Sequence, residues 1–194
     1  RLSYRTDMKI AITGGIGTGK SYVCCILEKH GITVYDCDKA AKRLMANSAQ
    51  IKKALTALVG EDAYDEHGLC KSVLATFILK SEGNANAVDN IVHPAVAEDF
   101  KESGLDWIES AIFFDSGFNK RVNVDYVICV TAPLEIRIQR IVKRDNITVE
   151  KAMEWINTQL PSEEGMRKSD FIIHNDGKSD INEQIEKIID IIYK

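Results

Sequence analysis

The stretch GGIGTGKS, residues Gly14–Ser21, decides which fold this sequence can adopt. A glycine, four further residues and then Gly-Lys-Ser form the phosphate-loop (P-loop) pattern. Its glycines let the backbone turn sharply, so that successive N–H groups point at phosphate oxygens, and the helix that follows adds its positive N-terminal end. Lys20 is placed to reach the terminal phosphates and the Ser21 hydroxyl to bind Mg²⁺. The stretch therefore predicts a mononucleotide site.

Short apolar runs alternate with helical patterns on both sides of this loop. Such alternation implies a parallel sheet covered by helices on both faces, and ligands then bind outside the carboxyl ends of the strands. The predicted fold class is α/β, a P-loop three-layer αβα sandwich with a mostly five-stranded parallel sheet. Strands are predicted at residues 9–13, 32–36, 106–114, 125–130 and 171–175, and helices at 20–30, at 134–145, from Thr148 as N-cap, and at 180–194.

Composition narrows the class of protein. The 194 residues are 45% hydrophobic and 28% charged, which is ordinary for a folded soluble domain. A net charge of -4 offers no general attraction to nucleic acid or to an anionic membrane. The five cysteines are odd in number and include no C-x-x-C pair, so reduced thiols in a cytoplasmic protein are expected. Residues 1–7, before Met8, are interpreted as a cloning remnant or an alternative start.

Two aspartates follow the second predicted strand in VYDCDKAAKRL. In an extended chain, Asp36 and Asp38 point the same way and lie at the edge of the sheet where the phosphates bind. One carboxylate would help to hold Mg²⁺ through water, and the other would accept the proton of an acceptor hydroxyl. The alternative is a pair of turn or capping residues, with Asp38 as the cap of the following helix.

Three arginines share one face of the helix predicted at residues 134–145. At 100° per residue, Arg137, Arg140 and Arg144 fall within about 60° of one another. They form either a solvated helix face or a mobile lid that brings guanidinium groups to a transferring phosphate and excludes water. The residues alone leave both interpretations open.

The motifs distinguish a kinase from a nucleotide switch. Neither N-K-x-D nor a D-x-x-G after a strand is present, whereas a kinase's carboxylates and extra positive charge are. Two alternatives remain: another small-molecule or nucleotide kinase on the same core, and a nucleotide-binding regulator that does no chemistry.

Five segments together resemble one family. They are ITGGIGTGKS, GITVYDCDKAAK, IVHPAV, RIQRIVKRDNITVEKAMEWINTQLPSEE and SDFIIHNDG, and the likeness runs from about Lys9 to Lys194. The chain resembles the dephospho-coenzyme A kinases, P-loop kinases akin to the nucleoside monophosphate kinases. The resemblance implies ATP-dependent phosphorylation of the ribose 3′-hydroxyl of 3′-dephospho-coenzyme A, the last step of coenzyme A synthesis. It also implies Mg²⁺ and a cytoplasmic location. The sequence does not fix the oligomeric state; a monomer or weak homo-oligomer is expected, with no nucleic-acid or membrane partner.

The resemblance also implies an organisation and a set of roles. A single domain over residues 8–194 would comprise a core (8–44, 106–134 and 168–194), a helical acceptor-binding segment (45–105) and a lid (135–167). Catalytic roles fall to Asp38, Lys20 and Arg140. ATP would bind Gly15, Ile16, Gly17, Thr18, Gly19, Lys20, Ser21, Tyr22, Arg144 and Asn175; the acceptor would bind Asp36, Lys42, His93 and Pro94; and Mg²⁺ would bind Ser21 and Asp36. His93 has an alternative as a structural histidine before a proline turn.

The chain departs from the family pattern at a few positions. Asp115 stands where a glutamate is usual, which shortens the reach of the acid. Gly165 replaces a basic residue, and Arg167 or Lys168 is a candidate to compensate. Lys42 stands where arginine is common and so offers a point charge in place of a bidentate fork. None of these changes removes the phosphate loop, the aspartate pair or Arg140, so an active enzyme is expected.

Overall fold

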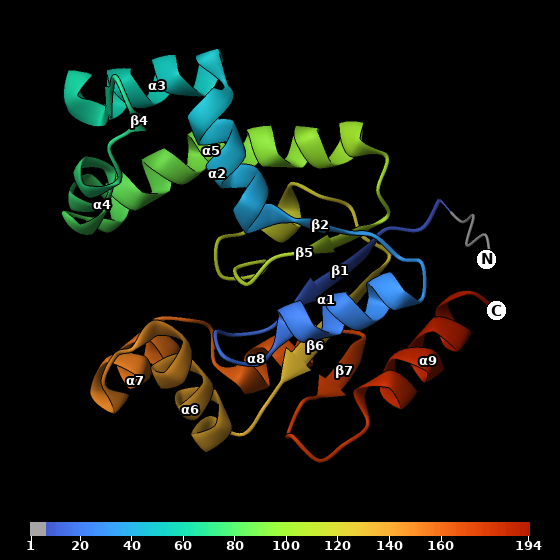
Figure 1. Ribbon diagram of the computed structural model, residues 1–194. Coiled ribbons are helices and arrows are strands. Elements are labelled where there is room, and N and C mark those ends of the chain that lie inside the picture. The colour runs from blue at the N-terminus through green and yellow to red at the C-terminus, as the bar shows by residue number, and fades with distance from the viewer. Residues whose placement is uncertain (1–6) are drawn as a thin grey trace. The chain divides into compact units, whose positions relative to one another are not determined.

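The computed structural model describes residues 7–194, which form two compact units (Figure 1). The core unit extends to Tyr35 and resumes at Leu105, and the helical unit comprises Asp36–Gly104. The interpretation of residues 1–7 as a remnant or alternative start therefore lies, but for Asp7, outside the described residues. Within the described part of the chain, none of the helices has both the length and the apolar character that crossing a bilayer requires.

A five-stranded sheet forms the centre of the core unit, in the order β2-β5-β1-β6-β7. Strand β1 is central: Ile10 pairs in parallel with Trp107 on one side and with Tyr126 on the other. This confirms the predicted five-stranded parallel sheet. The strands are β1 (Ile10–Thr13), β2 (Val34–Asp36), β5 (Trp107–Glu109), β6 (Tyr126–Thr131) and β7 (Phe171–His174).

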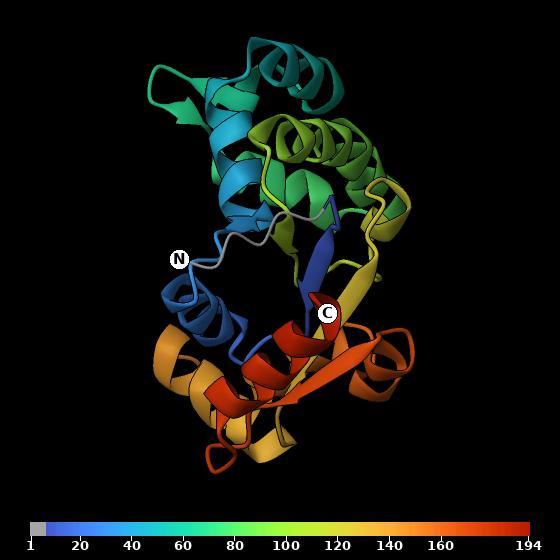
Figure 2. The ribbon, with the colours of Figure 1, turned by 90° about the vertical axis from the view of Figure 1, so that its right-hand side faces the viewer.

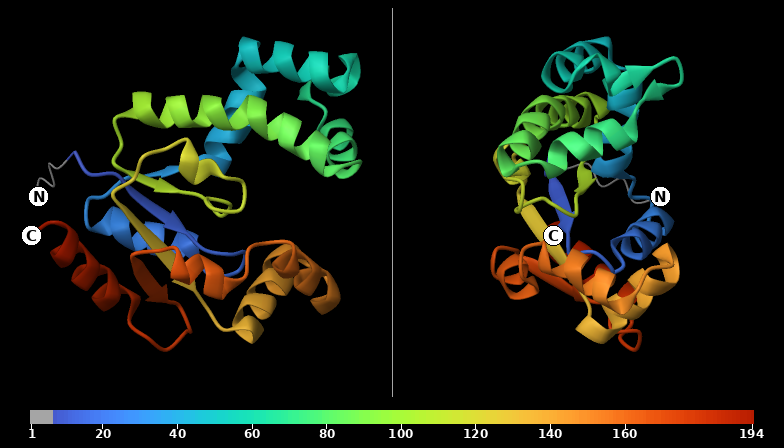
Figure 3. Two further views of the ribbon diagram at one scale, coloured as in Figure 1. Left: turned by 180° about the vertical axis from the view of Figure 1, so that it is seen from behind. Right: turned by 90° about the vertical axis from the view of Figure 1, so that its left-hand side faces the viewer.

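Helices α1 (Lys20–Lys29) and α9 (Ile181–Ile192) cover one face of the sheet (Figure 1). Their buried isoleucines, leucine and valine join Ile10, Ile12 and Ile128 of the strands in one apolar cluster. Figure 3 shows the opposite face, where α8 (Ser162–Arg167) packs against β6. The apolar cluster anchors the phosphate loop, because the loop joins buried β1 to α1, whose Val23, Ile26 and Leu27 are buried in that cluster.

The strand predicted at residues 106–114 is shorter than expected. Strand β5 ends at Glu109, after which Ser110 donates its N–H to Ile12 O and the chain turns away. The apolar residues beyond it serve a different purpose, since Phe113 is buried and makes edge-to-face ring contacts with Phe114 and Phe118. An aromatic cluster in a turn thus explains an apolar run that resembles a strand.

The later helices of the core unit agree with their predicted positions. Helix α6 (Leu134–Asp145) has the predicted bounds, and α7 (Val149–Asn157) begins at Thr148, whose side chain accepts a hydrogen bond from Lys151 N at 3.1 Å. Helices α6 and α7 pack together and are seen from another side in Figure 2. Together with α8 they occupy most of the predicted lid segment.

The helical unit is built around one long helix, α5 (Glu82–Ser103). Three further helices pack on it: α2 (Cys37–Asn47), α3 (Ala49–Val59) and α4 (Lys71–Leu79). A two-stranded hairpin, β3 (Tyr64–Asp65) with β4 (Gly68–Leu69), lies between α3 and α4 in the chain. Since α2 packs on α5, residues 36–44 belong by contact to this unit, whereas the sequence had grouped them with the core.

Candidate functional site: a phosphate loop held from behind by arginines

The phosphate loop uses its carbonyl groups within the protein and leaves several N–H groups without a protein acceptor. Gly14 O accepts from Lys20 Nζ at 2.7 Å, and Gly15 O accepts from Thr18 Oγ1 at 2.8 Å. Among the hydrogen bonds of residues 7–194, none involves the backbone N–H of Gly17, Gly19, Lys20 or Ser21. Donors that converge at a helix N-terminus are suited to bind an anion.

Gly19 is the N-cap of α1 and has a φ of 89°, in the left-handed region. A Cβ atom at this position would lie 2.1 Å from Asn175 Nδ2, a separation that no side chain tolerates. Glycine is therefore required here both by conformation and by the close approach of Asn175.

Lys20 is largely buried, with 11% of its side chain exposed. Burial lowers the pKa of Lys20, and the charge of Glu109, whose Oε1 lies 3.9 Å from Nζ, acts in the opposite direction. Glu109 ends β5, beside the end of β1. The sequence did not point to it, because the apolar residues that follow made the strand look longer and drew attention to Asp115.

Arg140 and Asn175, predicted near the phosphates, both contact the loop. Arg140 Nη1 lies 3.3 Å from both Gly17 O and Thr18 O, while its Nη2 donates to Asn175 O at 3.0 Å. Asn175 Nδ2 donates to Thr18 O at 2.9 Å. These bonds connect the end of β7 and the middle of α6 to one turn of the phosphate loop.

Arg137 and Arg144, from the same helix face, have different surroundings. Arg137 is buried, donates from Nε to Ile16 O at 2.9 Å and from Nη1 to Ser162 Oγ at 3.0 Å. Burial lowers its pKa. Arg144 is mostly exposed and pairs with the neighbouring Asp145 at 2.7 Å. The helix face is therefore not a uniformly solvated one.

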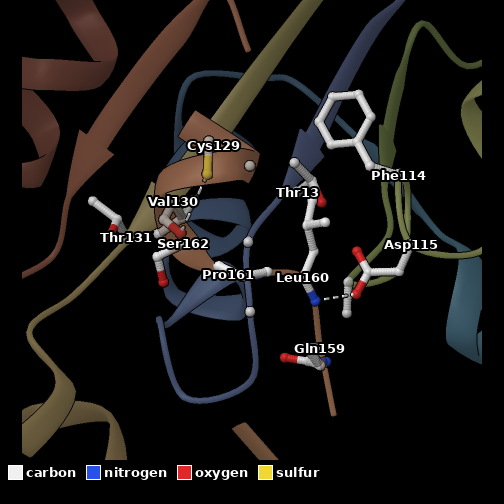
Figure 4. Close-up of a pocket in the computed structure, with 14 residues that line it drawn as sticks. Thr13, Phe114, Asp115, Cys129, Val130, Thr131, Gln159, Leu160, Pro161 and Ser162 are labelled. Atoms are coloured by element: carbon white, nitrogen blue, oxygen red, sulfur yellow. Dashed lines mark hydrogen bonds between the residues drawn. The ribbon is translucent and has the colours of Figure 1, made fainter. Parts of the chain in front are cut away.

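The connection between α7 and α8 is attached to the phosphate loop through Gln159, whose Oε1 accepts the N–H of Ile16 at 2.7 Å. The next residue, Leu160, donates its N–H to Asp115 Oδ2, also at 2.7 Å (Figure 4). A cavity of about 20 Å³ lies between these groups, with Gly14, Gly15 and buried Cys129 in its wall. It has room for about one water molecule. Asp115, despite its shorter reach, thus holds the backbone of the predicted lid segment.

The remaining departures also have definite surroundings. Gly165 faces β6, where an added Cβ would lie 3.7 Å from Cys129 Sγ. Arg167 and Lys168 both pair with Glu164, and Lys168 also lies over the Phe114 ring. Ser21 and Tyr22, both predicted to bind ATP, are exposed on the first turn of α1. All five cysteines are free thiols, as expected.

In the helical unit, the two aspartates do not lie on one extended segment. Asp36 ends β2 and is the N-cap of α2, accepting a hydrogen bond from Lys39 N at 2.9 Å. Asp38 is already in the first turn of the helix and pairs with Lys42 at 2.8 Å. The expected strand geometry of the pair is therefore wrong, and so is the alternative of Asp38 as cap. The hydrogen bond to Asp38 raises the pKa of Lys42.

His93 and Pro94 lie inside α5, so His93 does not precede a turn. The His93 ring is buried, and its Nε2 lies 3.4 Å from Asp89 Oδ1, one helical turn earlier. Across residues 7–194, no group of three or more His, Cys, Asp or Glu side chains could hold a metal ion. A hydroxyl such as that of Ser21 suits Mg²⁺ bound mainly by phosphates and water.

A phosphate loop at the end of the central parallel strand, contacted by two arginines of α6, defines a P-loop kinase. A family model described as Dephospho-CoA kinase matches residues 8–180. A dephospho-CoA kinase of Bacteroides fragilis (strain YCH46) is 41% identical over 194 residues, covering 96% of this chain and 94% of its own. The chain belongs to the dephospho-CoA kinase family.

Solved structures share the fold. TT1252 from Thermus thermophilus is 26% identical with a TM-score of 0.84, covering 98% of this chain and 100% of that one. A dephospho-CoA kinase from Campylobacter jejuni is 23% identical with a TM-score of 0.63, covering 95% and 96% of the two chains.

Proposed function

We propose that this protein transfers the γ-phosphoryl group of ATP to the ribose 3′-hydroxyl of 3′-dephospho-coenzyme A, which yields coenzyme A and ADP. The observation that carries this proposal is the ordered phosphate loop with its free N–H donors, in a chain of the dephospho-CoA kinase family. The reaction is the last step of coenzyme A synthesis. We place it in the cytoplasm, carried out by a monomer or weak homo-oligomer whose partners are small molecules.

On the nucleotide side, the loop from Gly15 to Tyr22 would bind the phosphates through its backbone N–H groups. Lys20 would leave Gly14 O and move its ammonium group to the β- and γ-phosphates, where it balances charge that spreads over the transferred group. Arg140 supports the loop from behind, and Arg144 is free to exchange its surface partner Asp145 for a phosphate. Asn175 holds the turn at Thr18.

On the acceptor side, Asp38 would accept the proton of the attacking hydroxyl. Asp38 comes two residues after the end of β2, its side chain is 78% exposed, and its present partner Lys42 is a surface lysine. An exposed pair of this kind exchanges partners at little cost. Lys42 would then be available to an anionic group of the acceptor, and Asp36, His93 and Pro94 would line its path.

The Ser21 hydroxyl would hold Mg²⁺, with Asp36 reached through water, and the ion would supply positive charge against the charge of the phosphates. The protein contributes the rest by positioning, because the loose transition state of phosphoryl transfer needs in-line alignment more than covalent help. The segment comprising α6, α7 and their connection to α8 would exclude water, which otherwise competes with the acceptor hydroxyl.

The proposal is tested by measuring ADP release from ATP and Mg²⁺, with and without 3′-dephospho-coenzyme A, for the wild type and Asp38→Asn. We expect strong stimulation by this acceptor and a loss of about 10²–10⁴-fold in kcat for the variant, the range of a general base. Asp65→Asn, an exposed aspartate of the β3–β4 hairpin, is the matched control. If only another hydroxyl compound stimulates ADP release, the protein is a kinase but dephospho-coenzyme A is not its acceptor. Tight ATP binding without turnover would reject catalysis altogether.

A further inference from the structure

Arg137 has an unusual environment for a permanently charged side chain. The residue is 5% exposed, and its guanidinium packs against the phosphate loop. A Cβ atom added to Gly15 would lie 2.4 Å from Arg137 Nη2. Any side chain at position 15 would displace it. The glycine and the arginine are therefore fitted to one another, in addition to the turn that the loop requires.

The hydrogen bonds of Arg137, together with those of Arg140, bind consecutive carbonyl groups of the loop. Its Nε donates to Ile16 O, while Arg140 Nη1 reaches the next two carbonyls, Gly17 O and Thr18 O. Two guanidinium groups of α6 thus bind three consecutive carbonyl groups. Gln159 Oε1 accepts a hydrogen bond from the N–H of Ile16. Because α6 binds these carbonyl groups, the loop keeps a conformation in which the N–H groups that have no protein acceptor remain available to an anion.

The charge of Arg137 has no carboxylate beside it. In the described residues 7–194, no salt bridge includes Arg137, and its polar partners Ile16 O and Ser162 Oγ are both neutral. Lys20, by contrast, has Glu109 at 3.9 Å. A buried charge without an opposite charge is costly, and such a cost is tolerated where a ligand removes it.

We propose that Arg137 is a positioning residue of the nucleotide site, which holds the phosphate loop from behind through Ile16 and supplies positive charge that only the bound polyphosphate balances. The inference rests on the proposed function, because it assigns the charge to ATP and ADP. It predicts that the charge of Arg137 lowers the stability of the ligand-free protein and raises its affinity for nucleotides. The gain in affinity should increase with the number of phosphates on the nucleotide.

The test compares Arg137→Met and Arg137→Lys with the wild type in two measurements. Titration calorimetry with Mg²⁺ gives the dissociation constants of AMP, ADP and ATP, and urea unfolding of the ligand-free protein gives its stability. Lys143→Met is the matched control, since it removes one exposed positive charge from the same helix. Steady-state kinetics with dephospho-coenzyme A then separate KM for ATP from kcat.

We expect Arg137→Met to weaken ADP and ATP binding by about 10- to 100-fold, the range of a charge-assisted hydrogen bond, and to weaken AMP binding less. The ligand-free protein should be at least as stable as the wild type, because methionine fills the space without a buried charge. Arg137→Lys should recover part of the affinity, since its ammonium keeps the charge but cannot form both bonds. KM for ATP should rise more than kcat falls.

Unchanged ADP affinity in Arg137→Met would overturn the inference. So would a loss of affinity matched by an equal loss of ligand-free stability, because that result describes a structural arginine alone. A wild type that binds ADP in this arginine-dependent way but does not phosphorylate dephospho-coenzyme A would instead overturn the proposed function and support the assignment of Arg137.

Discussion

The phosphate loop of the core unit and the acidic start of α2 in the helical unit hold their charges in opposite ways. Around the loop, Lys20 is largely buried and Arg137 is buried, and both donate hydrogen bonds to backbone carbonyls. At the start of α2, Asp38 and Lys42 are 78% and 67% exposed and bind each other. In the first region, buried Arg137 fixes the backbone of the loop before a ligand binds. In the second, Asp38 is neutralised by a surface lysine, which can exchange its partner easily.

This difference teaches which part of the reaction each region serves. A loop fixed before the nucleotide arrives avoids the free-energy cost of ordering donors during catalysis. A carboxylate that must receive a proton and then release it benefits from exposure and a weakly held partner. The two regions can therefore be separated experimentally, because changes in the first should affect nucleotide affinity and changes in the second the acceptor.

Among the changes that compare the two regions, the largest effect on ligand binding is expected for Gly19→Ala. The methyl group would meet the Asn175 amide at 2.1 Å while φ stays near 89°, so the loop must move and its donors lose their alignment. We expect ADP binding to weaken by about 10- to 100-fold, as befits backbone strain of this kind. Calorimetric titration with ADP measures it.

Gly31→Ala is the matched control for that substitution. Gly31 has a φ of 81°, yet nothing lies within 4 Å of an added Cβ, so it carries the same strain without the clash. ADP affinity should survive in this variant. Equal losses in both would show that the loop does not depend on the close approach of Asn175.

A smaller effect is expected for Lys42→Met in the exposed region. The ion pair with Asp38 should contribute less than about 1 kcal/mol to the free energy of unfolding, as exposed pairs do. KM for dephospho-coenzyme A should rise by about 3- to 10-fold, the value of a lost polar contact, with KM for ATP unchanged. Lys39→Met, which removes the exposed partner of Asp36, is the control. A rise in KM for ATP would break the proposed division between the regions.

The smallest effect is expected for Asp176, which follows Asn175. Its carboxylate accepts hydrogen bonds from backbone N–H groups, whereas that of Asp38 pairs with a lysine. Hydrogen bonds from Ser179 N and Lys178 N lower the pKa of Asp176 from 3.8 to about 2. Because the folded-state pKa is depressed, its contribution to stability is present above pH 3.8 and is lost as the pH falls toward 2.

Urea unfolding of the wild type and Asp176→Ala at several pH values measures this contribution. The difference in unfolding free energy should shrink steadily below pH 4, as the Asp176 carboxylate becomes protonated. A difference independent of pH would mean that Asp176 acts through backbone geometry alone.

Much of the fold could be predicted because the pattern is local. Helix α6 has the predicted bounds, Thr148 caps α7 as expected, and the parallel sheet follows from alternating apolar runs. Strand β5 could not be bounded in this way, because hydrophobicity does not distinguish a strand from an aromatic cluster such as that of Phe113.

The site residues that belong to sequence motifs could be predicted. Those that are placed by contacts between residues distant in sequence were harder to predict. Motifs predict that Lys20, Arg140 and Asn175 lie near the phosphates, and all three contact the phosphate loop. A helical wheel places Arg137 and Arg144 on one face, but which of them is buried depends on Ile16 and Ser162, 121 and 25 residues away in sequence from Arg137. Gln159 could not be predicted for the same reason, because its bond to Ile16 joins residues 143 apart in sequence.

The position of the central strand also has a consequence for synthesis on the ribosome. Ile10 of β1 finds its neighbours only when Trp107 and Tyr126 have been made. The helical unit, residues 36–104, is continuous in sequence and is complete before β5 emerges. Non-local parallel pairing is slow, whereas local helical packing is fast. The nascent chain should therefore fold its middle first, and the earliest-made residues of the nucleotide site should be among the last to acquire their structure.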